Sequence, residues 1–277
     1  PENWLPYFGN AVYGLECSSL DAIELPKTIK ALPILQNPVV TNRPEMPTWF
    51  VLNQPEGQMI AWRKGSATGE LIDEANEDMA VYLTWVEKYI SENQDNSEVL
   101  ELLKNNDAPH DIVVDCQLSK DNYQTICLPF DVETLEGTPY EGATVLEFVD
   151  VQLKSVGDVQ QLDLVFEERT AWPVLEAGKP YLIKPVDDIQ IEVTWVGVQE
   201  VKDLKTVEYE VGMGGKVVFG GLMAPTAIAA GNYLLNTQNQ LERLSVETEL
   251  PALHAYFQIT GVEENTDLNV DAGDHFV

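Results

Sequence analysis

The stretch "IQIEVTW", Ile189–Trp195, alternates apolar and polar side chains without a break. In an extended chain, side chains at every second position point to the same face. The pattern therefore predicts a β-strand with one buried face and one face in water. Trp195 belongs to the buried face, and we expect its ring in the core.

The same period of two recurs through 111–277, for example in Leu162–Phe166 and Val207–Val211. Glycine-rich turn signals separate these runs, and no helical repeat lies between them. Short strands at such spacing are typical of an antiparallel β-sandwich or jelly roll. We predict such a domain over 107–277. Within it, Pro180 and Pro185 bound the strand Tyr181–Lys184, which indicates a place at a sheet edge.

The stretch "YQTICLPFDV", 123–132, reads as a strand that ends at Pro129. If it formed a hairpin with 112–118, Cys116 and Cys127 would lie diagonally rather than opposite each other, which disfavours a disulfide. Three cysteines, with Cys17, are too few for a disulfide framework, so we expect buried thiols. Cys127 has no basic neighbour in sequence, which argues against an activated thiolate.

The region 66–106 allows two interpretations. Apolar residues from Ile72 to Ile90 recur at helical spacing, yet "AVYLTWV", 80–86, is rich in strand-forming residues. We expect a helix-containing or extended connector, with a polar link at 91–98 and a short helix in "VLELLKNN", 99–106. The N-terminal region 1–65 is proline-rich from Pro33 to Pro55, which favours an irregular path.

The charge balance is strongly acidic, with 46 Asp and Glu against 16 Lys and Arg, for a net charge of −30. Both halves share it: residues 1–110 carry 17 acids and 7 bases, and 111–277 carry 29 and 9. Such a field repels phosphate backbones and anionic membrane surfaces, so nucleic acid and membrane insertion are not expected. No apolar run approaches the roughly 20 residues that span a bilayer. The chain carries no initiator Met or signal peptide, and we expect Pro1 to be a processed or trimmed end.

The segment "VYGLECSSLDAIELPKTIKAL", 12–32, resembles one rung of the leucine-rich repeats of Bacteroidetes surface antigens, which run roughly "FYGCSSLTSIELPNSVTSI". Glu16 is an extra residue relative to that pattern. Repeats of this kind bury their faces only by stacking. The resemblance implies a terminal rung or a degenerate cap.

A second resemblance extends over about 91–277. Three ordered stretches, at 94–132, 175–185 and 250–261, are similar to a C-terminal module of Bacteroides and Prevotella surface proteins, through "YQTICLPFDV", "AGKPYLIK" and "LPALHAYF". Tyr123-Gln124 replaces the usual Trp-Asn, and Asp107-Ala108 replaces a glycine. The resemblance implies an exported β-sandwich displayed on the outer cell surface.

Candidate ligand-binding residues are few. Trp62 and Trp172 lie in loop-like sequence and could stack on sugar rings, or they could plug the ends of the sandwich. Asp267, Asn269 and Asp271 alternate like the start of a calcium loop, although its glycine is misplaced and no closing glutamate follows, which favours a frayed tail. His110, His254 and His275 have no zinc-like spacing and are expected at the surface or in the core. We expect no cofactor other than possible calcium.

Three functions fit these features. The first is a non-catalytic adhesion or spacer module that contacts a host protein, a glycan or another surface protein through its loops. The second is an accessory carbohydrate-binding domain that uses Trp62 and Trp172. The third is a hydrolase whose carboxylates follow no recognisable motif, and it requires acids with strongly perturbed pKa values in a cleft.

Overall fold

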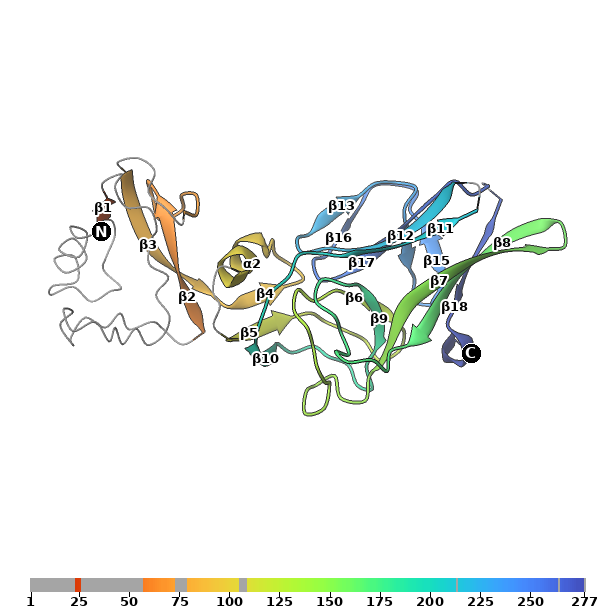
Figure 1. Cartoon of the computed structure of the whole chain (residues 1–277), viewed down its shortest axis with the longest axis horizontal. Coiled ribbons are helices and arrows are strands. Elements are labelled where there is room, and N and C mark those ends of the chain that lie inside the picture. Colours follow the sequence, from red (N-terminus) through yellow and green to blue (C-terminus); the bar gives the residue numbers. More distant parts are fainter. Residues whose placement is uncertain are drawn as a thin grey trace. The chain divides into compact units, whose positions relative to one another are not determined.

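The structure is a computed structural model that describes residues 23–25, 57–72, 79–104, 109–212, 214–263 and 265–276. Its contacts divide the chain into two compact units, Pro1–Lys88 and Tyr89–Val277. Eighteen strands, β1 to β18, and one α-helix, α2, occupy the described residues (Figure 1). The prediction of a mainly β chain is confirmed.

The described part of the first unit is an antiparallel sheet with strand order β1-β3-β2. The strands are β1 (Ile23–Leu25), β2 (Gln58–Lys64) and β3 (Met79–Glu87). Of the predicted leucine-rich rung, the structure describes β1 alone. The proline-rich segment and Cys17 lie outside the described residues.

The strand β3 resolves the two interpretations of 66–106. Met79–Glu87 is extended, so the helical interpretation is wrong for this segment. Val81–Glu87 of β3 pairs with the whole of β2, from Glu87 opposite Gln58 to Val81 opposite Lys64. Pairing satisfies the backbone of a segment whose β-branched and aromatic residues already favour a strand. The short helix predicted after the polar link is confirmed by α2 (Ser97–Lys104).

The second unit contains fifteen strands. They are β4 (Tyr89–Ser91), β5 (His110–Asp115), β6 (Gln124–Ile126), β7 (Thr144–Val156), β8 (Val159–Glu168), β9 (Tyr181–Lys184), β10 (Val193–Val198), β11 (Thr206–Val211), β12 (Gly215–Gly221), β13 (Thr226–Ile228), β14 (Tyr233–Leu235), β15 (Leu241–Arg243), β16 (Thr248–Leu250), β17 (Ala255–Thr260) and β18 (Asp267–Asp271). A 3-10 helix, Gly273–Phe276, follows β18.

These strands form two five-stranded sheets, β11-β12-β17-β14-β15 and β18-β8-β7-β9-β6, beside a three-stranded sheet, β10-β5-β4, and the pair β13-β16. The β7–β8 hairpin projects beyond its neighbours (Figure 1). Nearly all pairs are antiparallel, as predicted, but β18 pairs with β8 and β4 with β5 in parallel. The unit starts at Tyr89, earlier than the predicted domain start at 107, because β4 and α2 belong to it.

The main core lies between the two five-stranded sheets. Phe219 and Phe257 stack with their ring centroids 4.3 Å apart, and Phe148 and Phe166 from the opposite sheet meet them edge-on. All four rings are buried. Each such burial contributes about 1.5–3 kcal/mol, so this aromatic cluster is a main source of stability. A sandwich-like packing of the two sheets follows.

The structure corrects two expectations: the strand expected over Ile189–Trp195 begins only at Val193 (β10), with Ile191 62% exposed, and the strand Tyr181–Lys184 is not at a sheet edge. β5 pairs with β4 and β10, whereas β6 pairs with β9, so 112–118 and 123–129 do not form the hairpin considered for the cysteine geometry. β9 lies between β7 and β6 and is not an edge strand. Leu182 and Ile183 pair on both sides, while Pro180 and Pro185 lie just outside the strand and remove no ladder hydrogen bond.

The stretch "YQTICLPFDV" lies inside this scaffold. Cys116 and Cys127 are buried free thiols, as predicted. Cys127 donates a backbone hydrogen bond to Leu253 (2.7 Å) and packs so closely against Gly221 that a Cβ there would overlap its sulfur. Thr125 and Ile126 are both buried, so both faces of β6 are covered. Apart from the exposed Asp131, the stretch contributes packing.

Candidate functional site

The loop that carries Trp172 is anchored, although its indole ring is open to solvent. Trp172 is 72% exposed, so the interpretation of its ring as a plug of the sandwich is wrong. Arg169 Nη2 donates to the carbonyl of Pro173 (3.2 Å), and Leu175 exchanges two backbone hydrogen bonds with Val132. The loop is thus held on both sides of an aromatic ring that remains largely exposed.

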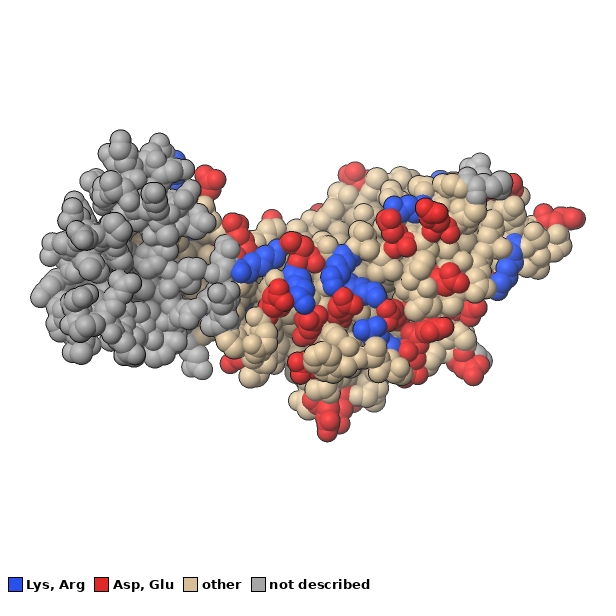
Figure 2. All heavy atoms as spheres, in the orientation of Figure 1, with Lys and Arg blue, Asp and Glu red and all other residues tan. Residues whose placement is uncertain are grey.

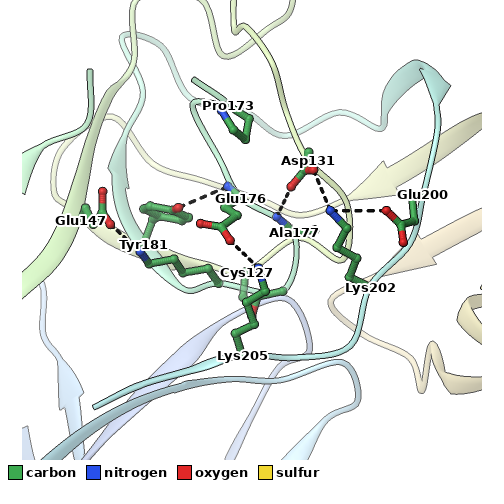
Figure 3. Close-up of polar contacts among 12 residues, drawn as sticks. Cys127, Asp131, Glu147, Pro173, Glu176, Ala177, Tyr181, Glu200, Lys202 and Lys205 are labelled. Atoms are coloured by element: carbon green, nitrogen blue, oxygen red, sulfur yellow. Dashed lines mark hydrogen bonds and ion pairs between the residues drawn. The ribbon is translucent and has the colours of Figure 1, made fainter. Parts of the chain in front are cut away.

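A group of ion pairs, here called the ion-pair strip, includes Arg169, whose side chain also anchors the Trp172 loop. The strip consists of Arg169, Lys179, Lys202, Lys205 and Lys104 with Glu147, Asp131, Glu200, Glu176 and Asp203. Figure 2 shows Lys and Arg side chains gathered among acidic ones on one face. Figure 3 shows that Lys202 lies between Asp131 and Glu200, and that Lys205 reaches Glu176. The strip concentrates half of the cations of a strongly acidic unit.

The strip is most buried around Glu147 of β7. Its carboxylate accepts hydrogen bonds from both Arg169 and Lys179, whose cationic groups lie 5.9 and 5.8 Å from the Tyr181 ring centre. Burial acts to raise the pKa of Glu147, but the two hydrogen bonds and two positive charges outweigh it and lower the pKa. The carboxylate therefore stays ionised and fixes the side chain that anchors the Trp172 loop.

Trp62, the other predicted sugar-stacking residue, lies in β2 and is 5% exposed. A buried ring offers no open face to a ligand. Trp195 is buried as predicted, with its ring centre 5.4 Å from that of Tyr140 and 6.1 Å from that of Phe130. Of the two candidate sugar-stacking residues, Trp62 is therefore buried and Trp172 has an exposed ring.

The candidate calcium residues form a strand. Asp267, Asn269 and Asp271 are alternate residues of β18, which pairs in parallel with β8, so the expected frayed tail is wrong. Asn269 donates to Asp163 Oδ1 (3.0 Å), and Asp271 accepts from the Gly273 backbone (3.1 Å). Alternate strand residues lie about 6.5 Å apart, so these three side chains do not surround one ion as an EF-hand loop does.

A cluster that the sequence did not indicate lies where β4, β5 and β17 meet, and it contains Glu92, Cys116 and His254. One ligand atom from each lies within 4.8 Å of the other two. His254 Nε2 is 3.2 Å from Glu92 Oε2, which also accepts from the Gln117 backbone (3.1 Å). The histidines had been expected only at the surface or in the core. Cys116 and His254, 138 positions apart, lie close together here although they follow β5 and precede β17 in different sheets, and no local spacing reveals that proximity.

Neither described thiol is activated. Burial, followed by the charges of Glu92 and Asp115, raises the pKa of Cys116 far above its ordinary value. Burial raises the pKa of Cys127 to about 12. Because the thiolate is the nucleophilic form, neither cysteine suits nucleophilic catalysis at neutral pH, as the sequence predicted for Cys127.

No protein-family model, curated protein or solved structure matched this chain. Among the residues that the structure describes, no helix is long and apolar enough to cross a membrane. The resemblance to Bacteroidetes surface proteins therefore stays a prediction from the sequence.

Proposed function

We propose that this chain is a non-catalytic binding or adhesion module of an exported bacterial protein, displayed on the outer cell surface. The observation that carries the proposal is the exposed ring of Trp172 on an anchored loop. Trp and Arg are the residue types that dominate binding energy in protein interfaces. The partner is a host protein, a glycan or another surface protein.

The anchoring of the loop supports a role in recognition. Arg169 holds the Pro173 carbonyl, and Glu147 and the Tyr181 ring hold Arg169 in turn. A ring presented on an ordered loop loses less conformational entropy when a partner covers it. Arg169 and its partner Glu147 supply charges of both signs next to the anchored loop, which suits a polar rim beside an aromatic anchor.

The titration of the carboxyl groups supports a non-catalytic role. A hydrolase of the glycosidase type needs one carboxylic acid whose pKa is raised. Among the described residues, every carboxyl group with a resolved shift has a lowered pKa: Glu92, Asp95, Asp131, Glu147, Asp163 and Glu176. The hydrolase alternative therefore has less support than either binding function.

An accessory carbohydrate-binding domain is the second candidate. The exposed Trp172 ring favours it, because a flat aromatic face can stack on a sugar ring. Trp62, which the sequence offered as a partner in this function, is buried and does not contribute to it.

The test compares Trp172→Ala with Val196→Ala, a matched removal of an exposed apolar side chain that is 79% exposed and lies in β10. Both proteins and the parent are screened on a glycan array and on immobilised mucin and extracellular-matrix proteins. We expect Trp172→Ala to weaken binding at least about tenfold, as for an interface hot spot, and Val196→Ala to leave it unchanged. Binding to glycans alone would favour the second candidate. Equal binding by all three proteins would refute a role for the Trp172 loop.

A further inference from the structure

We propose that Glu92, Cys116 and His254 form a binding site for one divalent transition-metal ion of the zinc type. The three side chains supply one carboxylate oxygen, one sulfur and one imidazole nitrogen. Thiolate and imidazole select zinc-like ions over calcium or magnesium, which take oxygen ligands. The site is independent of the Trp172 loop and of the binding function proposed for it.

The spacing of the ligand atoms fits a tetrahedral ion. Bonds of about 2.0–2.3 Å to zinc place its ligand atoms roughly 3.3–3.8 Å from one another. The His254 and Glu92 atoms are already 3.2 Å apart, and all three ligand atoms lie within 4.8 Å. Side-chain adjustments of about 1 Å therefore suffice to close the site around an ion.

The backbone around the ligands is fixed. Glu92 donates its N–H to Asp115 (2.9 Å) and accepts from Ala252 (2.8 Å), while the carbonyl of His254 accepts from Leu222 (2.9 Å). These bonds tie the segment after β4 to the segment before β17. Ordered ligands lose little entropy on binding, so the cluster is preorganised for an ion.

The hydroxyl of Thr125 orients the imidazole of His254. His254 Nδ1 lies 3.4 Å from Thr125 Oγ1, which accepts a hydrogen bond from the Ala255 backbone (3.0 Å). When Nδ1 carries the proton and donates it to this hydroxyl oxygen, the lone pair of Nε2 faces Glu92 and Cys116. Metal-bound histidines usually donate their other ring N–H in this way.

An ion can reach the cluster from solvent, and its binding displaces the thiol proton of Cys116. The Glu92 and His254 side chains are 13% and 14% exposed, so one side of the cluster is open to water. Binding replaces the thiol proton of Cys116, which leaves to solvent, and forms the metal–sulfur bond. The bound ion would cross-link the β10-β5-β4 sheet to the sheet that contains β17, and so stabilise the second unit.

The test uses Co²⁺ as a spectroscopic probe in the full chain, with Cys17→Ser as the background and excess Ca²⁺ to saturate surface carboxylates. We expect one equivalent of Co²⁺ to bind and to give a sulfur-to-cobalt charge-transfer band in the near ultraviolet. Cys116→Ser should abolish the band, whereas Cys127→Ser, the matched buried thiol, should keep it. Absence of the band in the background protein, or its persistence in Cys116→Ser, overturns the proposal.

A second pair of variants keeps the test decisive if Cys116→Ser does not fold. His254→Gln removes a proposed ligand at the partly exposed side of the cluster and should weaken Zn²⁺ binding at least about tenfold. Thr125→Val removes the hydroxyl that contacts His254 Nδ1 and should weaken binding by about 10-fold. Saturating Zn²⁺ should raise the unfolding midpoint of the background protein by about 5 °C and leave that of His254→Gln unchanged. An equal rise in both proteins would indicate surface carboxylate binding and would refute the site.

Discussion

The turn around Asn96 and the ion-pair strip are both polar, yet they contribute differently to the fold. Asn96 is fully buried. Its side-chain Oδ1 accepts a hydrogen bond from the Ser91 N–H (2.9 Å), and its Nδ2 donates to the carbonyls of Ser91 (2.9 Å) and Met223 (3.0 Å). Members of the strip such as Lys205 and Glu176 are 42% and 36% exposed. Burial decides how much stability is lost when a polar contact is removed, because water can replace the missing hydrogen-bond partner only at the surface.

The largest effect is expected at the buried end of this comparison. Asn96→Ala leaves the Ser91 N–H and carbonyl without their side-chain partner in a site that water does not reach. We expect a loss of about 2–4 kcal/mol in the free energy of unfolding, measured by urea denaturation. Asn93→Ala, an exposed asparagine in the same turn, is the control and should change it by less than about 0.5 kcal/mol. Similar losses in both variants would show that burial does not set the difference.

The second prediction concerns Glu147, whose side chain is 19% exposed and lies at the most buried point of the strip. Glu147→Gln removes the shared partner of Arg169 and Lys179, and we expect a loss of about 2 kcal/mol at pH 7. It should also release the Trp172 loop and weaken any binding that Trp172 carries. A loss of unfolding free energy below about 0.5 kcal/mol would show that Glu147 contributes no more than an exposed ion pair.

The pH dependence of the same variant gives an independent check. The folded-state pKa of Glu147 lies below the ordinary value of 4.5, so its contribution is present above that pH and is lost as the pH falls through the folded-state pKa. The curve of unfolding free energy against pH should therefore fall less steeply below pH 4.5 in Glu147→Gln than in the parent. Identical slopes would mean that the cations do not stabilise the ionised form.

Much of the sandwich could be predicted because its signals are local. The alternation in Leu162–Phe166 and Val207–Val211 places residues in β8 and β11 without knowledge of any partner. The partners themselves could not be predicted in this way. The parallel pairings of β18 with β8 and of β4 with β5 join distant segments, and they depend on how the sheets close.

The functional residues show the same limit. Trp172 stood out as an aromatic residue in a loop, but its exposure depends on which segments pass over it. Cys116 and His254 carried no local signal, because their contact arises from β5 and β17 in different sheets. Asn96 lay in the polar run 91–98, which reads as a solvated link. Asn96 directly precedes Ser97, the first residue of α2, but its side chain bonds to Ser91 and Met223 rather than to the helix, so a helix-cap signal would not have predicted its role.

The smallest effect is expected at the exposed end of the strip, where Lys104 meets Asp203. The two side chains are 35% and 90% exposed, so water solvates both charges whether or not they pair. Asp203→Asn should change the free energy of unfolding by less than about 0.5 kcal/mol in low salt, and by less still in 1 M NaCl, where screening removes most of the attraction. The same salt series on Glu147→Gln should retain most of its loss, because a partly buried pair is screened less. A large, salt-resistant loss in Asp203→Asn would show that the strip acts as one cooperative network, and the contrast between its buried and exposed ends would then fail.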